Sequence, residues 1–272
     1  MTNKTILAIL WVGTILLLGC SSSSKWSFQN KIFLTDISPI SIAADGDFLW
    51  LSDVAGNRLI KIDTNGNILQ EHKSVQRPMH IAIFQSKLYV PEFERDTIRI
   101  IDNQDRQNLS LVKPLDAPAA VAVKENDVAI ADFYNHRIVI KRGEQTSIIG
   151  KEGHQKGELY YPTDAAWYDS QLYVADAYNN RIQVFDEQGQ VLRIIGENDN
   201  IQVATGLTVA NEQLFVSDFE GNRILIYNTK GELLQTISSE ALNKPIDIEV
   251  VGDIMWVVNH EGGTLLQYKL RH

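Results

Sequence analysis

The sequence lacks most of the features that would identify an enzyme directly. It has one cysteine among 272 residues, so no intrachain disulfide can stabilise it. No nucleophile elbow, glycine-rich phosphate loop or His-Glu-x-x-His zinc motif occurs, and the six histidines show no metal-ligand spacing. Asp and Glu (34) outnumber Lys and Arg (25), which gives a net charge of −9, and no basic cluster is present. We therefore exclude nucleic acid as a partner.

Long apolar runs are also absent, with one exception near the start of the chain. Lys4 is followed by the thirteen-residue run Ile6–Leu18, which is too short to span a bilayer and is typical of the apolar core of a secretory signal. The ending Leu-Leu-Gly-Cys20 resembles the bacterial lipoprotein cleavage box, in which the cysteine is lipidated. The alternative is an ordinary signal peptide with a chance cysteine.

This N-terminal pattern predicts the domain boundaries and the location. We expect residues 1–19 to be a lipoprotein signal peptide and residues 20–25 a lipidated cysteine with a serine-rich tether. Residues 26–272 would form the folded domain. The protein is then exported and held at the bacterial cell envelope by its lipid, on the periplasmic side of the outer membrane if the source has two membranes.

The rest of the chain is an internal repeat of about forty residues. In the clearest copy, starting at Pro162, we predict strands at Thr163–Trp167, Gln171–Ala175, Arg181–Phe185 and Val191–Ile195, separated by turn residues. Equivalent copies start at Pro39, Pro78, Pro118, Ala204 and Pro245. One such unit cannot bury both faces of its sheet, so the copies must pack on one another.

The segment LYVADAYNNRIQVFD resembles the NHL repeat, and the resemblance covers the chain from about Trp26 to its end. Six such units imply an all-β, six-bladed β-propeller. The sixth copy supplies only three strands, whereas Trp26–Thr35 has strand composition and no blade of its own. We therefore predict that this N-terminal strand completes the last blade and closes the ring.

In propellers the first strand of each blade lines the central channel, so the position two residues after each blade start is expected at the channel mouth. In blades 1 to 6 this position holds Ser41, His80, Ala120, Asp164, Gly206 and Asp247. A histidine and two aspartates therefore stand in the alternate blades 2, 4 and 6. We predict a ligand site formed by His80, Asp164, Asp247 and Ser41. The first three could hold a divalent cation, calcium or zinc. Alternatively they are only solvated lining, or aspartates that fix the loop.

Two further rings of residues recur on the loops of the same face. An acidic or amide residue closes each second strand, and we interpret it as structural because it serves every repeat: Asp53, Glu92, Asp132, Asp176, Asp218 and Asn259. The residues that follow are more variable and suit recognition of a sugar, peptide or protein, or else packing between blades. The predicted rim consists of Phe93, Phe133, Tyr134, Tyr178, Phe219 and His260.

Three functions remain open. Without a nucleophile or metal motif, the sequence favours a protein without enzymatic activity that binds an envelope protein, peptide or glycan through its loop face, and we assign no catalytic residue. The alternative is a metal-dependent enzyme that resembles the NHL-like lyases or lactonase-type propellers. The third is a structural part of an envelope complex that uses its blade edges. Fold alone cannot decide among them.

Overall fold

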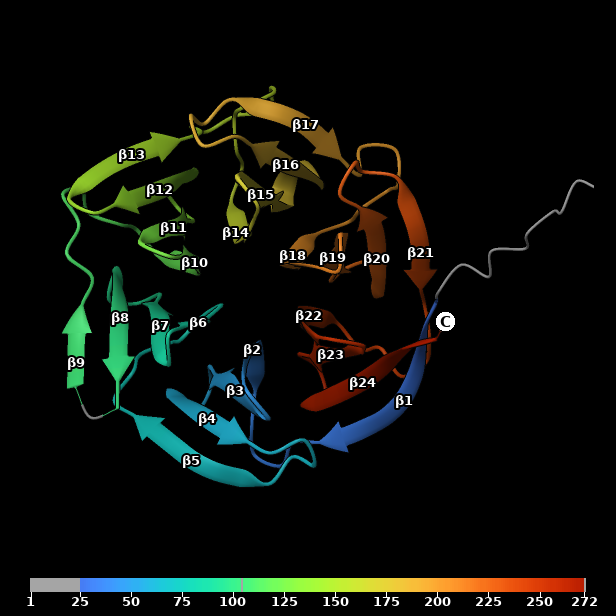
Figure 1. The fold of residues 1–272 in the computed structure, drawn as a ribbon. Helices are drawn as coiled ribbons and strands as arrows, with labels where there is room; N and C mark the ends of the chain where they lie inside the picture. Colours follow the sequence, from blue (N-terminus) through green and yellow to red (C-terminus); the bar gives the residue numbers. More distant parts are fainter. Residues whose placement is uncertain (1–24, 104, 272) are drawn as a thin grey trace, which may run out of the picture.

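The computed structural model describes residues 25–103 and 105–271, which form six four-stranded antiparallel sheets arranged as the blades of a propeller (Figure 1). Blade 1 comprises β2 (Pro39–Asp45), β3 (Phe48–Asp53), β4 (Arg58–Ile62) and β5 (Ile68–Lys73). Blade 2 comprises β6 (Ala82–Phe84), β7 (Lys87–Glu92), β8 (Thr97–Asp102) and β9 (Asp105–Asn108). Blade 3 comprises β10 (Pro118–Lys124), β11 (Asp127–Asp132), β12 (Arg137–Arg142) and β13 (Gln145–Ile149).

The second half of the ring repeats this order. Blade 4 comprises β14 (Pro162–Tyr168), β15 (Gln171–Asp176), β16 (Arg181–Phe185) and β17 (Val191–Ile195). Blade 5 comprises β18 (Ala204–Ala210), β19 (Gln213–Asp218), β20 (Arg223–Asn228) and β21 (Leu233–Ile237). Blade 6 comprises β22 (Pro245–Val251), β23 (Ile254–Asn259), β24 (Thr264–Arg271) and, from the other end of the chain, β1 (Lys25–Phe33). The six-bladed propeller predicted from the sequence is confirmed.

The ring is closed by β1, as predicted. It pairs antiparallel with β24, so that Lys25 lies opposite Arg271 and Phe33 opposite Thr264. Trp26 anchors it: the indole is buried, meets the Phe215 ring edge-on at 5.4 Å, and donates from Nε1 to Gln213 Oε1 at 3.2 Å. The N-terminal strand therefore bonds within blade 6 and also packs against blade 5, which leaves no open edge between the chain ends.

The turns explain why the strands end where they do. In blade 4 the turn residues Asp169 and Asn180 take left-handed φ values of 50° and 55°. Asp and Asn tolerate this region better than most residues, so they mark hairpin turns. Within the described residues there is no α-helix, only the 3₁₀ turn η1 (Ala177–Asn179), and no helix there is long and apolar enough to cross a membrane.

The residue that closes each second strand binds the loop entering its blade. Asp176 is fully buried and accepts from Tyr160 N–H at 2.8 Å, Arg181 Nε at 2.8 Å and Gln183 Nε2 at 2.9 Å. Blade 6 makes the equivalent bonds without charge, since Asn259 Oδ1 accepts from Asn243 N–H at 3.0 Å. The structural interpretation of this ring is borne out by these bonds.

The signal peptide predicted for residues 1–19, Cys20 and most of the predicted tether lie outside the described residues. Those boundaries remain predictions.

Candidate functional site

In most blades a bulge at the start of the first strand decides which side chains reach the channel mouth. In five blades the pairing with the second strand shifts between the blade-start residue and the second residue after it, as between Pro162 and Asp164. The residue directly after the blade start then lines the mouth: Ile40, Met79, Ala119, Thr163, Thr205 and Ile246. Sequence reasoning missed this ring, because a bulge moves the side-chain alternation by one position.

The predicted site residues lie one layer deeper and link neighbouring blades. Asp247 Oδ2 accepts from the Ile42 N–H of blade 1 at 2.9 Å. In the same way Asp164 Oδ2 accepts from the Leu207 N–H of blade 5 at 2.6 Å. Ser41 is fully buried, and its Oγ accepts from the N–H of Ile81 at 3.0 Å. Ser41 therefore contacts blade 2 and does not line the mouth.

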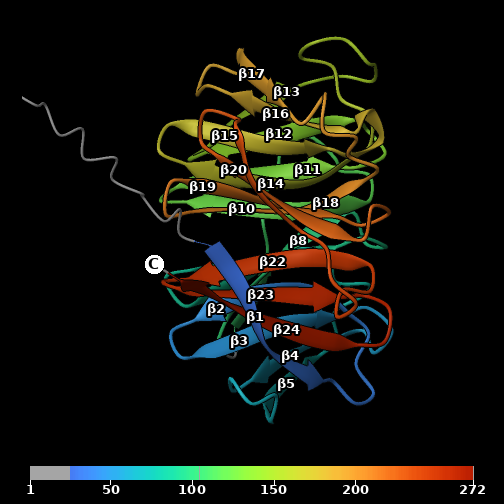
Figure 2. The same ribbon diagram turned by 90° about the vertical axis from the view of Figure 1, so that its right-hand side faces the viewer.

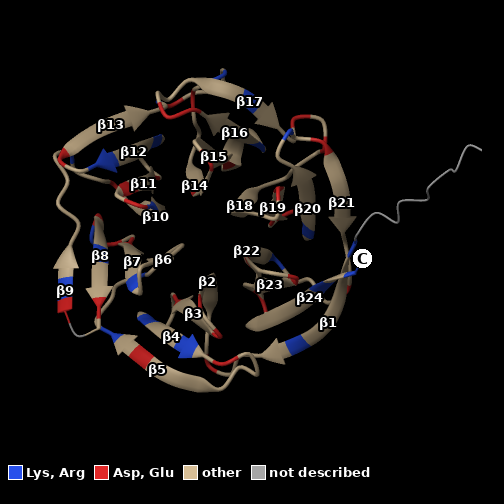
Figure 3. Ribbon diagram, viewed as in Figure 1, with Lys and Arg blue, Asp and Glu red and all other residues tan. Residues whose placement is uncertain are grey.

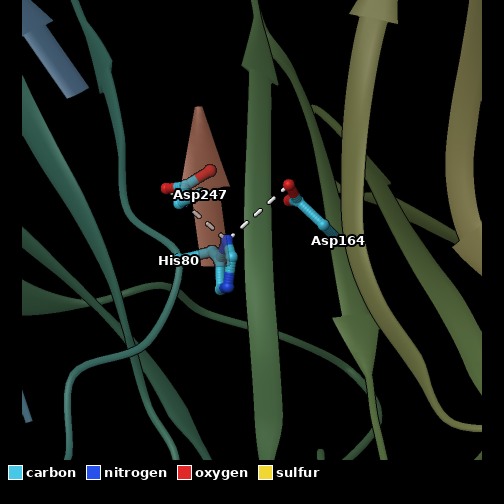
Figure 4. Close-up of side chains that lie close together, drawn as sticks. All are labelled: His80, Asp164 and Asp247. Carbon is cyan, nitrogen blue, oxygen red and sulfur yellow. Dashed lines mark ion pairs between the residues drawn. The ribbon is translucent and has the colours of Figure 1, made fainter. Parts of the chain in front are cut away.

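His80, Asp164 and Asp247 come together from blades 2, 4 and 6 (Figure 4). All three are buried, and His80 Nδ1 lies 3.6 Å from Asp164 Oδ2 and 3.6 Å from Asp247 Oδ2. These distances are too long for hydrogen bonds, and Nδ1 has no hydrogen-bond partner among the described residues. Figure 4 shows the other ring nitrogen, Nε2, on the side away from both carboxylates. We call these three residues the channel triad.

The charges of the channel triad depend on one another. Burial lowers the pKa of His80, but the two carboxylates outweigh burial and raise that pKa to about 10. Burial raises the pKa of Asp164, an effect that His80 partly offsets. Without a metal, His80 is therefore a positively charged imidazolium at neutral pH and lies between two carboxylates.

The geometry of the channel triad also fits a divalent cation. Its ligand atoms lie within 4.8 Å of one another, and Nδ1 is a buried polar atom without a partner. Two ligands of a tetrahedral zinc ion at about 2.1 Å each are separated by about 3.4 Å. Calcium, with bonds of about 2.4 Å to six to eight ligands, places neighbouring ligands about 2.8–3.4 Å apart. The two observed separations of 3.6 Å are slightly longer than either value and closer to that of zinc.

Above the channel triad is an open cavity of about 510 Å³, which we call the mouth cavity. Its wall is aromatic on the side of blades 2 to 4, where it contains Phe93, Phe133, Tyr134, Tyr161 and Tyr178. These rings contact one another, with centroids 5.8 Å apart for Phe93–Tyr134 and 5.0 Å apart for Tyr161–Tyr178. An open cavity with one aromatic wall suits a ligand that carries a ring.

Four of the six predicted rim residues line the mouth cavity: Phe93, Phe133, Tyr134 and Tyr178. Phe219 and His260 do not line it; their rings face each other at 6.1 Å. The sequence analysis missed Arg77 and Tyr161, which do line it. Both directly precede a blade-start proline, and that shared position could have identified them.

Below the channel triad a second cavity of about 190 Å³ occupies the channel. Both carboxylates of the triad line it, as does Glu249, whose pKa is raised to about 8 by burial and by the nearby charge of Asp247. His80 lines this cavity and the mouth cavity alike. It is therefore the residue that connects the channel triad with the mouth cavity.

No protein-family model matches the chain, and no curated protein matches it. Solved structures with the same fold do exist. A streptogramin B lyase aligns with a TM-score of 0.68 and 17% identity over 92% of this chain and 88% of its own. A gluconolactonase from Xanthomonas campestris aligns with a TM-score of 0.70 and 16% identity over 89% of each chain. A virginiamycin B lyase from Staphylococcus aureus, with quinupristin, aligns at 0.67 and 18% identity over 91% of this chain and all of its own. At these identities the likeness shows the fold.

The expectation of a protein without enzymatic activity is wrong on this comparison, because the solved structures just described are enzymes. The physical reason is that the absence of a motif with catalytic residues close along the chain carries little weight in this fold. In a propeller the candidate groups come singly from separate blades. His80 and Asp247 are 167 residues apart in sequence, yet their side chains meet.

Proposed function

We propose that this protein is an enzyme of the lyase or lactonase type whose reaction centre is the channel triad and whose substrate binds in the mouth cavity. The observation that carries the proposal is the position of His80. It lines the mouth cavity while its Nδ1 faces two buried carboxylates. A histidine oriented by carboxylates at one nitrogen and accessible at the other is a common arrangement for acid–base chemistry.

The residues of this chain have distinct roles in the proposal. The carboxylates of Asp164 and Asp247 face Nδ1 and keep the His80 ring in its doubly protonated, charged form, so Nε2 also carries a proton and can donate it toward the mouth cavity. An oxygen of the substrate that gains negative charge, as in ester cleavage or elimination, is stabilised by such a donor. The tyrosine hydroxyls of the wall offer further donors.

Where a divalent cation is bound, His80 Nδ1 and one oxygen each of Asp164 and Asp247 would hold it. It would supply a fixed positive charge next to the reacting group. His80 Nε2 remains a donor in this state as well. Calcium and zinc are the two ions we propose.

The test is turnover of a panel of lactones and cyclic ester-linked peptides by wild type, His80→Gln and a control, His154→Gln. His154 lies in the loop before β14 and outside the mouth cavity. We expect turnover of at least one compound by wild type and control, and a loss of about 100-fold or more in His80→Gln. Turnover that survives in a folded His80→Gln variant, or no turnover of any compound, would contradict the proposal.

We further propose that the chain is an NHL-type lipoprotein, exported and anchored through Cys20, and that its substrate is a peptide, glycan or protein-linked group of the envelope. The register of β1 supports a specific orientation. β1 runs along β24 across blade 6 (Figure 2). Its last residue, Phe33, pairs with Thr264 at the mouth face, whereas Lys25 pairs with Arg271 at the opposite face. Only five residues, 20–24, precede Lys25 in the mature chain, at most about 17 Å of extended backbone.

This register predicts that the mouth cavity faces away from the membrane, toward ligands in the surrounding compartment. The lipid anchor is tested by growing cells that express the protein with radiolabelled palmitate. We expect the label to be incorporated into the wild-type protein and not into Cys20→Ser. Unlabelled wild type would contradict it.

A further inference from the structure

The charge of the mouth cavity differs from that of the protein. The chain carries −9, and charged residues are spread around the ring, many of them on outer strands and turns (Figure 3). Yet no Asp or Glu is among the residues that line the mouth cavity. Apart from tyrosines, its ionisable side chains are Arg77 and His80. The two carboxylates of the channel triad balance the charge of His80, so Arg77 is the cation of the lining that remains available to a ligand. A cation at the edge of a cavity without carboxylates in its lining attracts anions.

Arg77 is held over the mouth by its surroundings. Its N–H donates to Asn57 Oδ1 at 2.7 Å, and its carbonyl oxygen accepts from the Phe93 N–H at 3.2 Å. The guanidinium lies over the Phe93 ring, 4.6 Å from the centroid. Its acidic neighbour, Glu94, is 3.8 Å away, at the limit of an ion pair, and both side chains are about half exposed (48% and 58%). Arg77 therefore retains donors for a ligand.

Blade 6 provides an internal comparison. Lys244 occupies the position equivalent to Arg77, directly before the blade-start proline, with a similar left-handed φ (53° and 45°). Its Nζ is bound to Glu220 Oε2 at 2.6 Å and lies over the Phe219 ring at 5.2 Å. Lys244 does not line the mouth cavity. The same position thus holds a neutralised cation in one blade and an available one in another.

The aromatic wall next to Arg77 contributes polar donors as well as ring faces. The hydroxyls of Tyr134, Tyr161 and Tyr178 have no hydrogen-bond partner within the described residues. The rings of Tyr134 and Tyr178 are about half exposed. A phenol hydroxyl can donate to an anionic oxygen while its ring packs against an apolar group.

We propose that the mouth cavity selects a ring-bearing anion, such as an aromatic or cyclic carboxylate, with its charge on Arg77 and its ring against the wall of Tyr134, Tyr161 and Tyr178. This inference names the substrate class of the site proposed above and rests on that proposal. The binding preference can be measured with compounds that do not react, so it is separable from turnover.

The experiment compares two probes of equal shape, naphthalene-2-carboxylate and naphthalene-2-carboxamide, by equilibrium dialysis against the full chain in lipid nanodiscs, with empty nanodiscs as blank. The proteins are wild type, Arg77→Met and the matched control Lys244→Met. We expect wild type and Lys244→Met to bind the carboxylate about tenfold more tightly than the amide, and Arg77→Met to bind the two about equally.

Equal binding of both probes by wild type would overturn the proposal. So would an unchanged preference in Arg77→Met, an equal loss in Lys244→Met, or no binding of the carboxylate. If the preference is found but no compound of the lactone and cyclic-ester panel is turned over, the binding class stands and the reaction type fails. If turnover is found without the preference, the proposed reaction type stands and the proposed binding class fails.

Discussion

Asp176 and Arg181 of blade 4 are expected to be strongly coupled in stability, and blade 6 shows how the coupling can be measured. Replacing Asp176 with alanine removes the acceptor of Tyr160 N–H, Arg181 Nε and Gln183 Nε2 within a fully buried site. Breaking a buried ion pair by removing one partner costs about 3–5 kcal/mol, so we expect Asp176→Ala to lower the free energy of unfolding by about that amount.

The exchange Asp176→Asn/Arg181→Thr copies the neutral arrangement of blade 6, where Asn259 Nδ2 donates to Thr264 Oγ1 at 2.9 Å. Asn keeps an acceptor for the loop N–H, so this double variant should lose only about 1–2 kcal/mol. Each single change should cost more, about 3 kcal/mol, because it leaves one charge buried and unpaired. Arg181 does keep bonds to the carbonyl oxygens of Gln155 and Glu158, which limits the cost of losing its carboxylate.

The assay is urea denaturation of wild type, both single variants and the double variant. The slope of the unfolding free energy against urea concentration, the m value, should be the same for all four proteins. With losses of about 3 kcal/mol for each single variant and about 1–2 kcal/mol for the double variant, we expect a coupling energy of about 4 kcal/mol. Single-variant losses that simply add in the double variant would refute the argument that the carboxylate and guanidinium stabilise each other across the loop.

Three further outcomes follow from the structure. Deleting residues 25–33 opens blade 6, so the truncated protein should lose cooperative thermal unfolding and associate in size-exclusion chromatography; a monomer with unchanged unfolding would refute ring closure by β1. Asp247→Asn should lower the pKa of His80, visible in an NMR titration of its ring, and an unchanged pKa would contradict the pairing of Asp247 with His80. The pKa of Glu249 is raised from 4.5 to about 8 in the fold, so stability should fall as the pH rises through this range, and Glu249→Gln should remove that part of the fall in melting temperature between pH 5 and pH 9. As a control, replacing the exposed Glu144 with glutamine should leave the dependence of melting temperature on pH as in wild type. The same dependence in Glu249→Gln as in wild type would refute the raised pKa of Glu249.

Most of the fold could be predicted because each repeat carries its own signals. The strands predicted for blade 4 differ from the observed ones by at most one residue at either end. The closing strand was predictable because the sixth copy lacked a fourth strand. Blade 2 departs most: Pro78 makes only an isolated bridge to Glu92, and the first strand shrinks to Ala82–Phe84.

The site was predictable only in part. The meeting of His80, Asp164 and Asp247 follows from equivalent positions in alternate blades. The depth of the two aspartates does not, because it depends on a bulge that has no signal in one sequence, and His80 lies before the shortened first strand of blade 2. The roles of Arg77 and Lys244 also could not be separated, since the two side chains turn toward different loops. Arg77 lies 3.8 Å from Glu94 of its own blade, and Lys244 lies 2.6 Å from Glu220 of the preceding blade.

The central claim, that the channel triad is a functional centre able to hold a divalent cation, is tested most directly by ¹⁵N NMR of histidine-labelled protein during titration with zinc or calcium. The account predicts that one equivalent of one of these ions shifts the Nδ1 resonance of His80, while the same titration leaves it unchanged in Asp164→Asn/Asp247→Asn. A His80 resonance that stays unchanged in wild type with both ions at saturation would contradict it.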